Sequence, residues 1–304
     1  MVENLKNSAC ASVALLNEGL GSLDIRIPPK LSEQRFWSPQ AFFRETYFTA
    51  GLRDLMIRVA GGLSGNFLPS IYELDARSGG GKTHALLALY HMVGAGASLN
   101  VPELRGLFSE ASTALPEKIN RVVITGGVSH PRVVGDALDD FEIKTLWGEI
   151  AWQIGGREAY EIVADHDRTG TPPPSNLLMN VLSDHSPCLI LVDGWLSYLN
   201  HVGQASERPD DEALLAHLGF IFSFSEAVRR VPGAVLVASE PEGVVFSDRR
   251  AREIRTELHK IFKFVERWQP ATPAEKLEIA RKRLCGDVAN NSDLVSLKPA
   301  EAEE

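Results

Sequence analysis

The run GGGKT at residues 79–83 has the residue types of a phosphate-binding loop. Consecutive glycines let backbone N–H groups converge on phosphate oxygens, and a helix that starts at the loop adds its positive N-terminal end. Lys82 would then reach the β and γ phosphates of ATP, and the Thr83 hydroxyl would ligate Mg²⁺. The usual pattern begins with a glycine where this chain has Ala76, and the alternative interpretation is a glycine turn before an ordinary helix. The predicted nucleotide contacts are Gly79, Gly80, Gly81, Lys82 and Thr83.

The acidic end of an apolar run supplies a second candidate. The run CLILVD (188–193) suits a strand buried on both faces, and it ends at Asp193. An aspartate at the end of such a strand can hold a water on Mg²⁺, so Asp193 is a predicted metal and catalytic residue. The alternative is a turn residue that ends the strand. ATPases of this general design often carry glutamate next, to orient the attacking water, and this chain has Gly194 there.

The next apolar run also ends in polar residues. The run AVLVAS (234–239) predicts another buried strand, with Ser239 at its end. The Ser239 hydroxyl can hydrogen-bond the attacking water or the γ phosphate, which is its predicted catalytic role, or it can bond its own turn. Glu240 is the nearest candidate for a substitute base, and the alternative is a solvated surface glutamate.

Two further groups of residues have both a functional and a surface interpretation. Arg252, Arg255 and His259 recur at helical spacing, so one helix face could present an arginine finger to a neighbouring subunit or touch nucleic acid. The alternative is a solvated amphipathic face. In ADHDR (164–168), alternating Asp and His residues of a predicted loop permit metal binding, although nothing else in the sequence suggests ligands.

These candidates need elements that bring strand ends together. The predicted strands are 70–76, 121–125, 188–193, 234–239 and 263–268. The predicted helices are 83–93 with Gly94 as its stop, 141–156, 211–231, 252–262, one that starts at Ser38-Pro39 and is ended by Gly61-Gly62 and Gly65, and one capped by Ser175. Strands separated by helices predict an α/β fold with a five-stranded parallel sheet and helices on both faces. Ligands of such sheets bind at the carboxyl ends of the strands.

Composition limits the function classes. The chain has 304 residues, 44% of them hydrophobic, and a formal net charge of -9. A large core is therefore available, and the acidic balance argues against a protein whose main role is to coat nucleic acid. Three widely spaced cysteines form neither a disulfide framework nor a metal-ligand pattern, and Cys188 is expected to be a small buried hydrophobe. With no signal peptide and no apolar run near the ~20 residues of a membrane span, a soluble cytoplasmic protein is predicted.

Taken in order, these features resemble an AAA+ ATPase core. More narrowly, the chain is similar over about residues 41–284 to the DUF499 family of prokaryotic predicted ATPases. The segments that carry this resemblance are AFFRETYFTAGLRDL, GGGKTHALLALYHM, TLWGEIAWQIGG, SPCLILVDGW and WQPATPAEKLEIARKRL. The resemblance implies an ATPase, usually part of a much longer chain and often encoded beside DNA methyltransferases in defence-type gene clusters. It carries over to the residues of the loop, 79–83, and to Asp193, whereas family members typically have glutamate where this chain has Gly194.

The resemblance also implies a division of the chain. We expect an N-terminal extension (1–37), an AAA+-like nucleotide-binding core (38–270), and the start of an incomplete helical lid with a polar tail (271–304). Lid contacts to the nucleotide would then come from a second copy in a homo-oligomer or from a C-terminal partner chain.

Three functional hypotheses follow from the sequence. In the first, the chain is a motor or switch subunit that hydrolyses ATP with Mg²⁺. In the second, which Gly194 favours, it is a regulatory module that binds ATP with little or no hydrolysis. In the third, it is a nucleic-acid-associated scaffold with a vestigial site, whose DNA contacts the net charge does not indicate.

Overall fold

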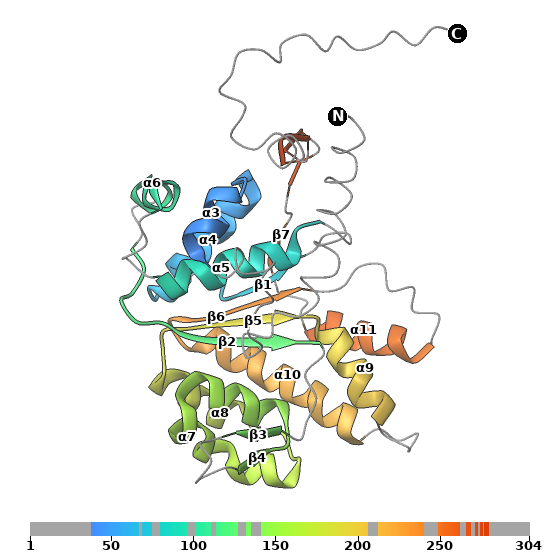
Figure 1. Cartoon of the computed structure of the whole chain (residues 1–304). Helices are drawn as coiled ribbons and strands as arrows, with labels where there is room; N and C mark the ends of the chain where they lie inside the picture. Colours follow the sequence, from blue (N-terminus) through green and yellow to red (C-terminus); the bar gives the residue numbers. More distant parts are fainter. Residues whose placement is uncertain are drawn as a thin grey trace, which may run out of the picture.

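A parallel sheet at the centre of the computed structural model carries the predicted strand ends (Figure 1). Its strands lie in the order β2-β5-β6-β1-β7, and each neighbouring pair is parallel. They are β1 Ile71–Leu74, β2 Asn120–Thr125, β5 Cys188–Asp193, β6 Ala234–Ser239 and β7 Glu266–Trp268. A separate antiparallel pair is formed by β3 Arg132–Val134 and β4 Phe141–Ile143. The predicted α/β class with a parallel sheet is therefore confirmed.

The structure describes most of the chain between residues 38 and 279. The described residues are 38–66, 69–74, 80–95, 101–110, 114–126, 132–134, 141–205, 212–239, 249–261, 266–268, 271–272, 274–275 and 277–279. The predicted N-terminal extension (1–37) and the polar tail lie outside them, as do Ala76, Gly79 and Glu240.

Helices cover both faces of the sheet (Figure 1). The helices of one face are α3 Pro39–Glu45, α4 Ala50–Leu63, α5 Lys82–Ala95 and α6 Pro102–Glu110. Those of the other face are α7 Leu146–Thr169, α8 Ser175–Asp184, α9 Trp195–Ala205, α10 Glu212–Arg230 and α11 Arg249–Ile261. In β5, Leu189 and Leu191 pack into the layer of α4 and α5, whereas Ile190 and Val192 pack into the layer of α7 and α10. Burial on both faces is the reason that β5 is a continuous apolar run.

The helix predicted to begin at Ser38-Pro39 is two helices. Ser38 caps α3 as expected, because its hydroxyl accepts a hydrogen bond from Ala41 N. The chain leaves the helix at Thr46, and α4 begins after Thr49, whose hydroxyl accepts from Leu52 N. The glycine pair at 61 and 62 lies within α4, which continues to Leu63, whereas Gly65 follows the helix end with φ +83, as predicted. A Cβ at Gly62 would lie 2.9 Å from Val235 Cγ2, so the glycine permits close packing of α4 on β6.

The predicted stop at Gly94 is also wrong, since α5 continues to Ala95. A Cβ at Gly94 would lie 2.2 Å from the Arg121 Nη1 atom. This glycine therefore makes room for a guanidinium, which also sits 4.3 Å from the centroid of the Tyr90 ring. A cation at the C-terminal end of a helix interacts favourably with the helix dipole.

The helix predicted over 141–156 differs at both ends. Residues 141–143 form β4, and α7 runs from Leu146 to Thr169 with a break at Gly155 and Gly156. Gly156 has φ +63, and the His185 ring occupies the place where a side chain at Gly155 would lie. The expected cap at Ser175 is wrong: Ser175 is the first residue of α8, and the preceding residue, Pro174, makes no side-chain cap.

Cys188 is fully buried at the start of β5, as the sequence predicted. Burial raises the pKa of its thiol to about 12. The thiol therefore stays protonated near neutral pH and behaves as a small apolar group.

Candidate functional site

Three polar side chains lie next to one another at the carboxyl ends of adjacent strands. In the register of the sheet, Thr125 of β2 is the partner of Asp193 of β5, and Asp193 is the partner of Ser239 of β6. Side chains alternate between the faces of a sheet, so each of the three shares a face with the residue two positions earlier. Those earlier residues, Val123, Leu191 and Val237, all pack into the core under α5. The row Thr125–Asp193–Ser239 therefore faces α5.

The first turn of α5 meets this row. Lys82 and Thr83 are the first two residues of the helix, and Gly81 precedes them with φ +87, a conformation that favours glycine. The Thr83 hydroxyl donates a hydrogen bond to Asp193 Oδ2 at 3.1 Å. The Ser239 hydroxyl donates to the other carboxylate oxygen, Asp193 Oδ1. The structure thus brings together three residues that are distant in the sequence, since Thr83 lies 110 positions before Asp193 and Ser239 lies 46 positions after it.

The donor set at this position suits a hard divalent cation. Thr83 directs its hydroxyl proton at Asp193, so the lone pairs of the Thr83 oxygen remain available to a metal ion. A hydroxyl oxygen and a carboxylate oxygen are the ligand types that Mg²⁺ takes in proteins, with water and phosphate oxygens completing its shell. The residues present therefore fit a magnesium ion.

Comparison with known proteins identifies the family. The family model described as the DUF499 N-terminal domain matches residues 30–269, which is more than three quarters of the chain. The chain belongs to the DUF499 family. A search of curated proteins found no match.

In this DUF499 domain, the residue after Asp193 is held in a conformation that few side chains adopt. Gly194 has φ +97, and its backbone N–H donates to the Ser239 carbonyl oxygen at 3.1 Å. A Cβ at Gly194 would find only ordinary contacts, the nearest being Ser197 at 3.6 Å. Gly194 therefore lies in a backbone conformation that favours glycine, although there is space for a side chain at this position.

The opposite side of the α5 turn is tied to α3 of the DUF499 domain. His84 follows Thr83, and its ring is stacked on Phe42 with centroids 4.7 Å apart. Its Nε2 atom lies 3.1 Å from the Thr46 hydroxyl, which itself donates to the Phe42 carbonyl oxygen at 2.7 Å. Since the single Thr46 proton is used on that carbonyl, the His84 Nε2–H is the donor in this pair. The start of α5 is therefore held by α3 on one side and by the strand ends on the other.

Some predicted residues cannot be compared with this site. Gly79 and Glu240 lie outside the described residues, and Gly80 lies at the edge of the described part of the loop. Lys82 is half-buried at the helix start. Arg252 and Arg255 are exposed on α11, where Arg255 Nε donates to His259 Nε2 at 3.3 Å, so the predicted helical face exists.

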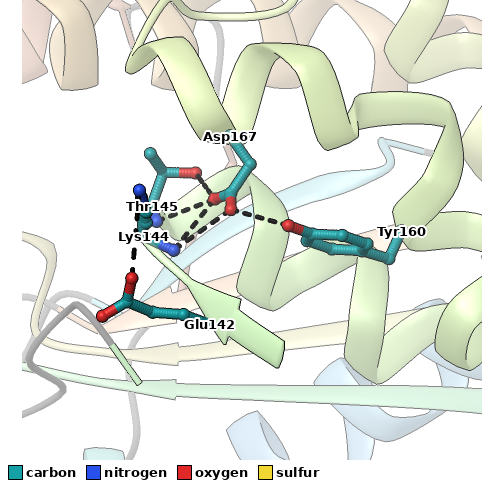
Figure 2. A network of polar contacts seen from close by, with 5 residues as sticks. All are labelled: Glu142, Lys144, Thr145, Tyr160 and Asp167. Atoms are coloured by element: carbon teal, nitrogen blue, oxygen red, sulfur yellow. Dashed lines mark hydrogen bonds and ion pairs between the residues drawn. The ribbon is translucent and has the colours of Figure 1, made fainter. Parts of the chain in front are cut away.

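The residues of ADHDR lie within α7 and not in the predicted loop. Figure 2 shows Asp167 as the acceptor of a hydrogen-bond network at the start of α7. Its carboxylate accepts from Thr145 N at 2.9 Å, from Lys144 N, from the Thr145 hydroxyl and from the Tyr160 hydroxyl. Burial, followed by the hydrogen bond to Asp167, raises the pKa of Tyr160 above its ordinary value. Among the described residues, no group of three or more His, Cys, Asp or Glu could hold a metal ion, so the metal interpretation of ADHDR finds no support.

The network also explains the shape of α7. Asp167 lies near the C-terminal end of α7 and bonds Thr145, the residue that caps its N-terminal end. A straight helix of this length would separate these ends by more than 30 Å, at about 1.5 Å per residue. The break at Gly155 and Gly156 therefore folds α7 back on itself as two helical segments.

No described helix is both long enough and apolar enough to cross a membrane.

Proposed function

We propose that this chain binds ATP together with Mg²⁺ at the carboxyl edge of its sheet, as a P-loop NTPase of the AAA+ type in which β7 is the fifth strand. The observation that carries the proposal is the contact between Thr83 and Asp193, since it joins the end of the GGGKT run to an acidic strand end. A glycine turn before an ordinary helix would give no reason for this contact. The order of β1, loop and α5 along the chain also supports the proposal.

Each residue of the site has a role in this proposal. The phosphate groups would be held by the backbone N–H groups of Gly79, Gly80 and Gly81. The N-terminal end of α5 would also attract them. Lys82 would neutralise the β and γ phosphates. Thr83 and Asp193 would hold Mg²⁺, which when bound neutralises charge on the phosphate oxygens. Ser239 orients the Asp193 carboxylate by its hydrogen bond and would contact the terminal phosphate or the attacking water.

Slow hydrolysis is part of the proposal. A glutamate that orients the attacking water contributes typically 10²–10⁴-fold to a rate by general base catalysis. The position after Asp193 cannot supply it, because Gly194 carries no side chain and has φ +97. We therefore propose a nucleotide switch whose occupied state lasts long, in a prokaryotic system associated with defence or DNA modification. The glycine at position 194 also favours the second candidate function, a regulatory module that binds ATP with almost no turnover.

The test measures nucleotide binding and phosphate release on the same sample, with and without Mg²⁺. We expect ATP binding that strengthens with Mg²⁺ and disappears in Lys82→Ala, because the variant loses the charge that meets the phosphates. Lys144→Ala is the matched control, since Lys144 is an exposed lysine whose side chain pairs with Glu142 at 3.8 Å. Equal nucleotide binding by wild type, Lys82→Ala and Lys144→Ala would sink the proposal.

The turnover measurement separates the two candidates. Phosphate release that is lost in Lys82→Ala indicates a hydrolysing switch. Tight ATP binding with no release above the Lys82→Ala background indicates the regulatory module.

A further inference from the structure

We infer that Thr125 is a positioning residue of this site and that its hydroxyl holds an oxygen atom of the bound Mg²⁺–nucleotide group. The inference rests on the proposed function and extends it to a residue outside the predicted motifs. Thr125 ends β2 and is the register partner of Asp193. Neighbouring strands lie about 4.8 Å apart, so the two side chains stand next to each other on the face toward α5.

The Thr125 hydroxyl is accessible to a ligand that binds beside Asp193. The residue is only 8% exposed, and no hydrogen bond between the described residues uses its hydroxyl. Among the described residues, the Thr125 oxygen is not one of the buried polar atoms that lack a partner, so water or a ligand can reach it. The two other hydroxyls around Asp193 have one, because Thr83 and Ser239 both donate to its carboxylate. The partner of Thr125 would then be part of whatever binds beside Asp193.

Thr125 is the last residue of β2, and the residue after it, Gly126, has no side chain. Gly126 follows, and its N–H donates to the Asp193 carbonyl oxygen at 2.9 Å. A Cβ at Gly126 would lie 2.5 Å from Ser197 Cβ, so a side chain there would collide with α9. Gly126 and Gly194 follow Thr125 and Asp193. Because neither glycine has a side chain, neither would stand between the Thr125 hydroxyl and a bound ligand.

A threonine hydroxyl at this place can orient an oxygen but cannot act as a base near neutral pH. Its proton or its lone pairs would fix a water on Mg²⁺ or an oxygen of the terminal phosphate. Both partners offer the same chemistry, an oxygen atom at the end of a hydrogen bond. They differ in which nucleotides present it, because ADP keeps a metal-bound water but lacks the terminal phosphate.

The test compares wild type, Thr125→Val and Thr125→Ser by calorimetric titration with ATP and ADP, each with and without Mg²⁺. Valine keeps the size of threonine and removes the hydroxyl, whereas serine restores it. We expect Thr125→Val to bind Mg²⁺–ATP roughly five- to tenfold more weakly, with Thr125→Ser close to wild type. Without Mg²⁺, affinity should change little if the partner is the metal-bound water, and affinity for ATP should still fall if the partner is the terminal phosphate. An equal loss for Mg²⁺–ADP identifies the metal-bound water, and a loss confined to ATP identifies the terminal phosphate.

Ser225→Ala is the matched control for loss of a buried hydroxyl. Ser225 lies on α10, on the other face of the sheet, and its Oγ has no hydrogen-bond partner. Its affinity should equal that of wild type. Wild-type affinity in Thr125→Val, an equal loss for ATP and ADP that persists without Mg²⁺, or failure of serine to restore binding would each overturn the inference alone. If wild type binds no nucleotide, the proposed function fails and the inference with it.

Discussion

Replacement of Asp167 by alanine should destabilise the chain strongly without changing the residues of the proposed nucleotide site. The Asp167 side chain is almost fully buried at 1% exposure, and it accepts hydrogen bonds from two backbone N–H groups and two hydroxyls. Alanine removes the acceptor and leaves those donors where they are. The variant also unties the two ends of α7, which meet at this carboxylate (Figure 2).

The magnitude follows from the number of donors that lose their acceptor. One buried group without a partner costs about 1–3 kcal/mol, and partial entry of water reduces the total for a cluster. With four donors involved, we expect the free energy of unfolding to fall by about 3–5 kcal/mol. This is a large part of the ~5–15 kcal/mol by which a typical domain is stable.

Urea unfolding followed by circular dichroism measures this change, with Asp165→Ala as the control. The Asp165 side chain is 84% exposed and pairs with Arg168 at 2.8 Å. Such surface pairs contribute about 0–1 kcal/mol. The reasoning is refuted if the two variants unfold at the same urea concentration, or if Asp167→Ala loses less than about 1 kcal/mol.

Three other changes test separate parts of the structure. Gly148→Ala should lower the free energy of unfolding by about 1–3 kcal/mol in the same urea assay, because its Cβ would lie 2.4 Å from Asp167 Oδ1; wild-type stability would contradict the packing described here. Gly194→Glu should lower the melting temperature, since φ +97 costs an L residue about 1–2 kcal/mol, yet raise phosphate release at least tenfold. No gain in phosphate release would mean that the base lies elsewhere. The pKa of Glu275 is lowered, chiefly by the hydrogen bond from Ala50 N, so its contribution is present above the ordinary value of 4.5 and is lost as the pH falls through the lowered pKa. Urea titrations of wild type and Glu275→Gln should therefore differ near neutral pH and converge in acid, and a difference that persists in acid would exclude this role.

The sequence was sufficient for the elements whose burial is continuous. The strands that became β5 and β6 read as apolar runs because both of their faces are covered, and their boundaries agree with the prediction. Asp193 and Ser239 could be predicted to meet because parallel strands end at the same edge of the sheet.

The sequence was insufficient where a contact from a distant element decides the local structure. Gly94 was predicted to stop the helix, but it lies within α5, where its lack of a side chain leaves room for the guanidinium of Arg121. In the sequence, Asp167 resembles a loop residue whose carboxylate could bind a metal, yet its backbone partners, Lys144 N and Thr145 N, lie more than twenty positions earlier. In the sequence, Thr125 is only the end of a strand, because its position beside Asp193 depends on the register between β2 and β5, which a single sequence does not contain.

The hydrogen bonds of Glu275 bear on where this domain ends. One carboxylate oxygen accepts from Ala50 N at 2.6 Å, at the first residue of α4, and the other accepts from Thr272 N at 2.8 Å. The match to the DUF499 N-terminal domain stops at residue 269, before both Thr272 and Glu275. A fragment cut at that boundary would keep the hydrogen bond from the Trp268 indole to the Gly51 carbonyl oxygen but would leave the first N–H of α4 without its acceptor. The boundary set by sequence similarity therefore falls several residues short of the boundary set by hydrogen bonding, and an expression fragment of this domain should extend beyond Glu275.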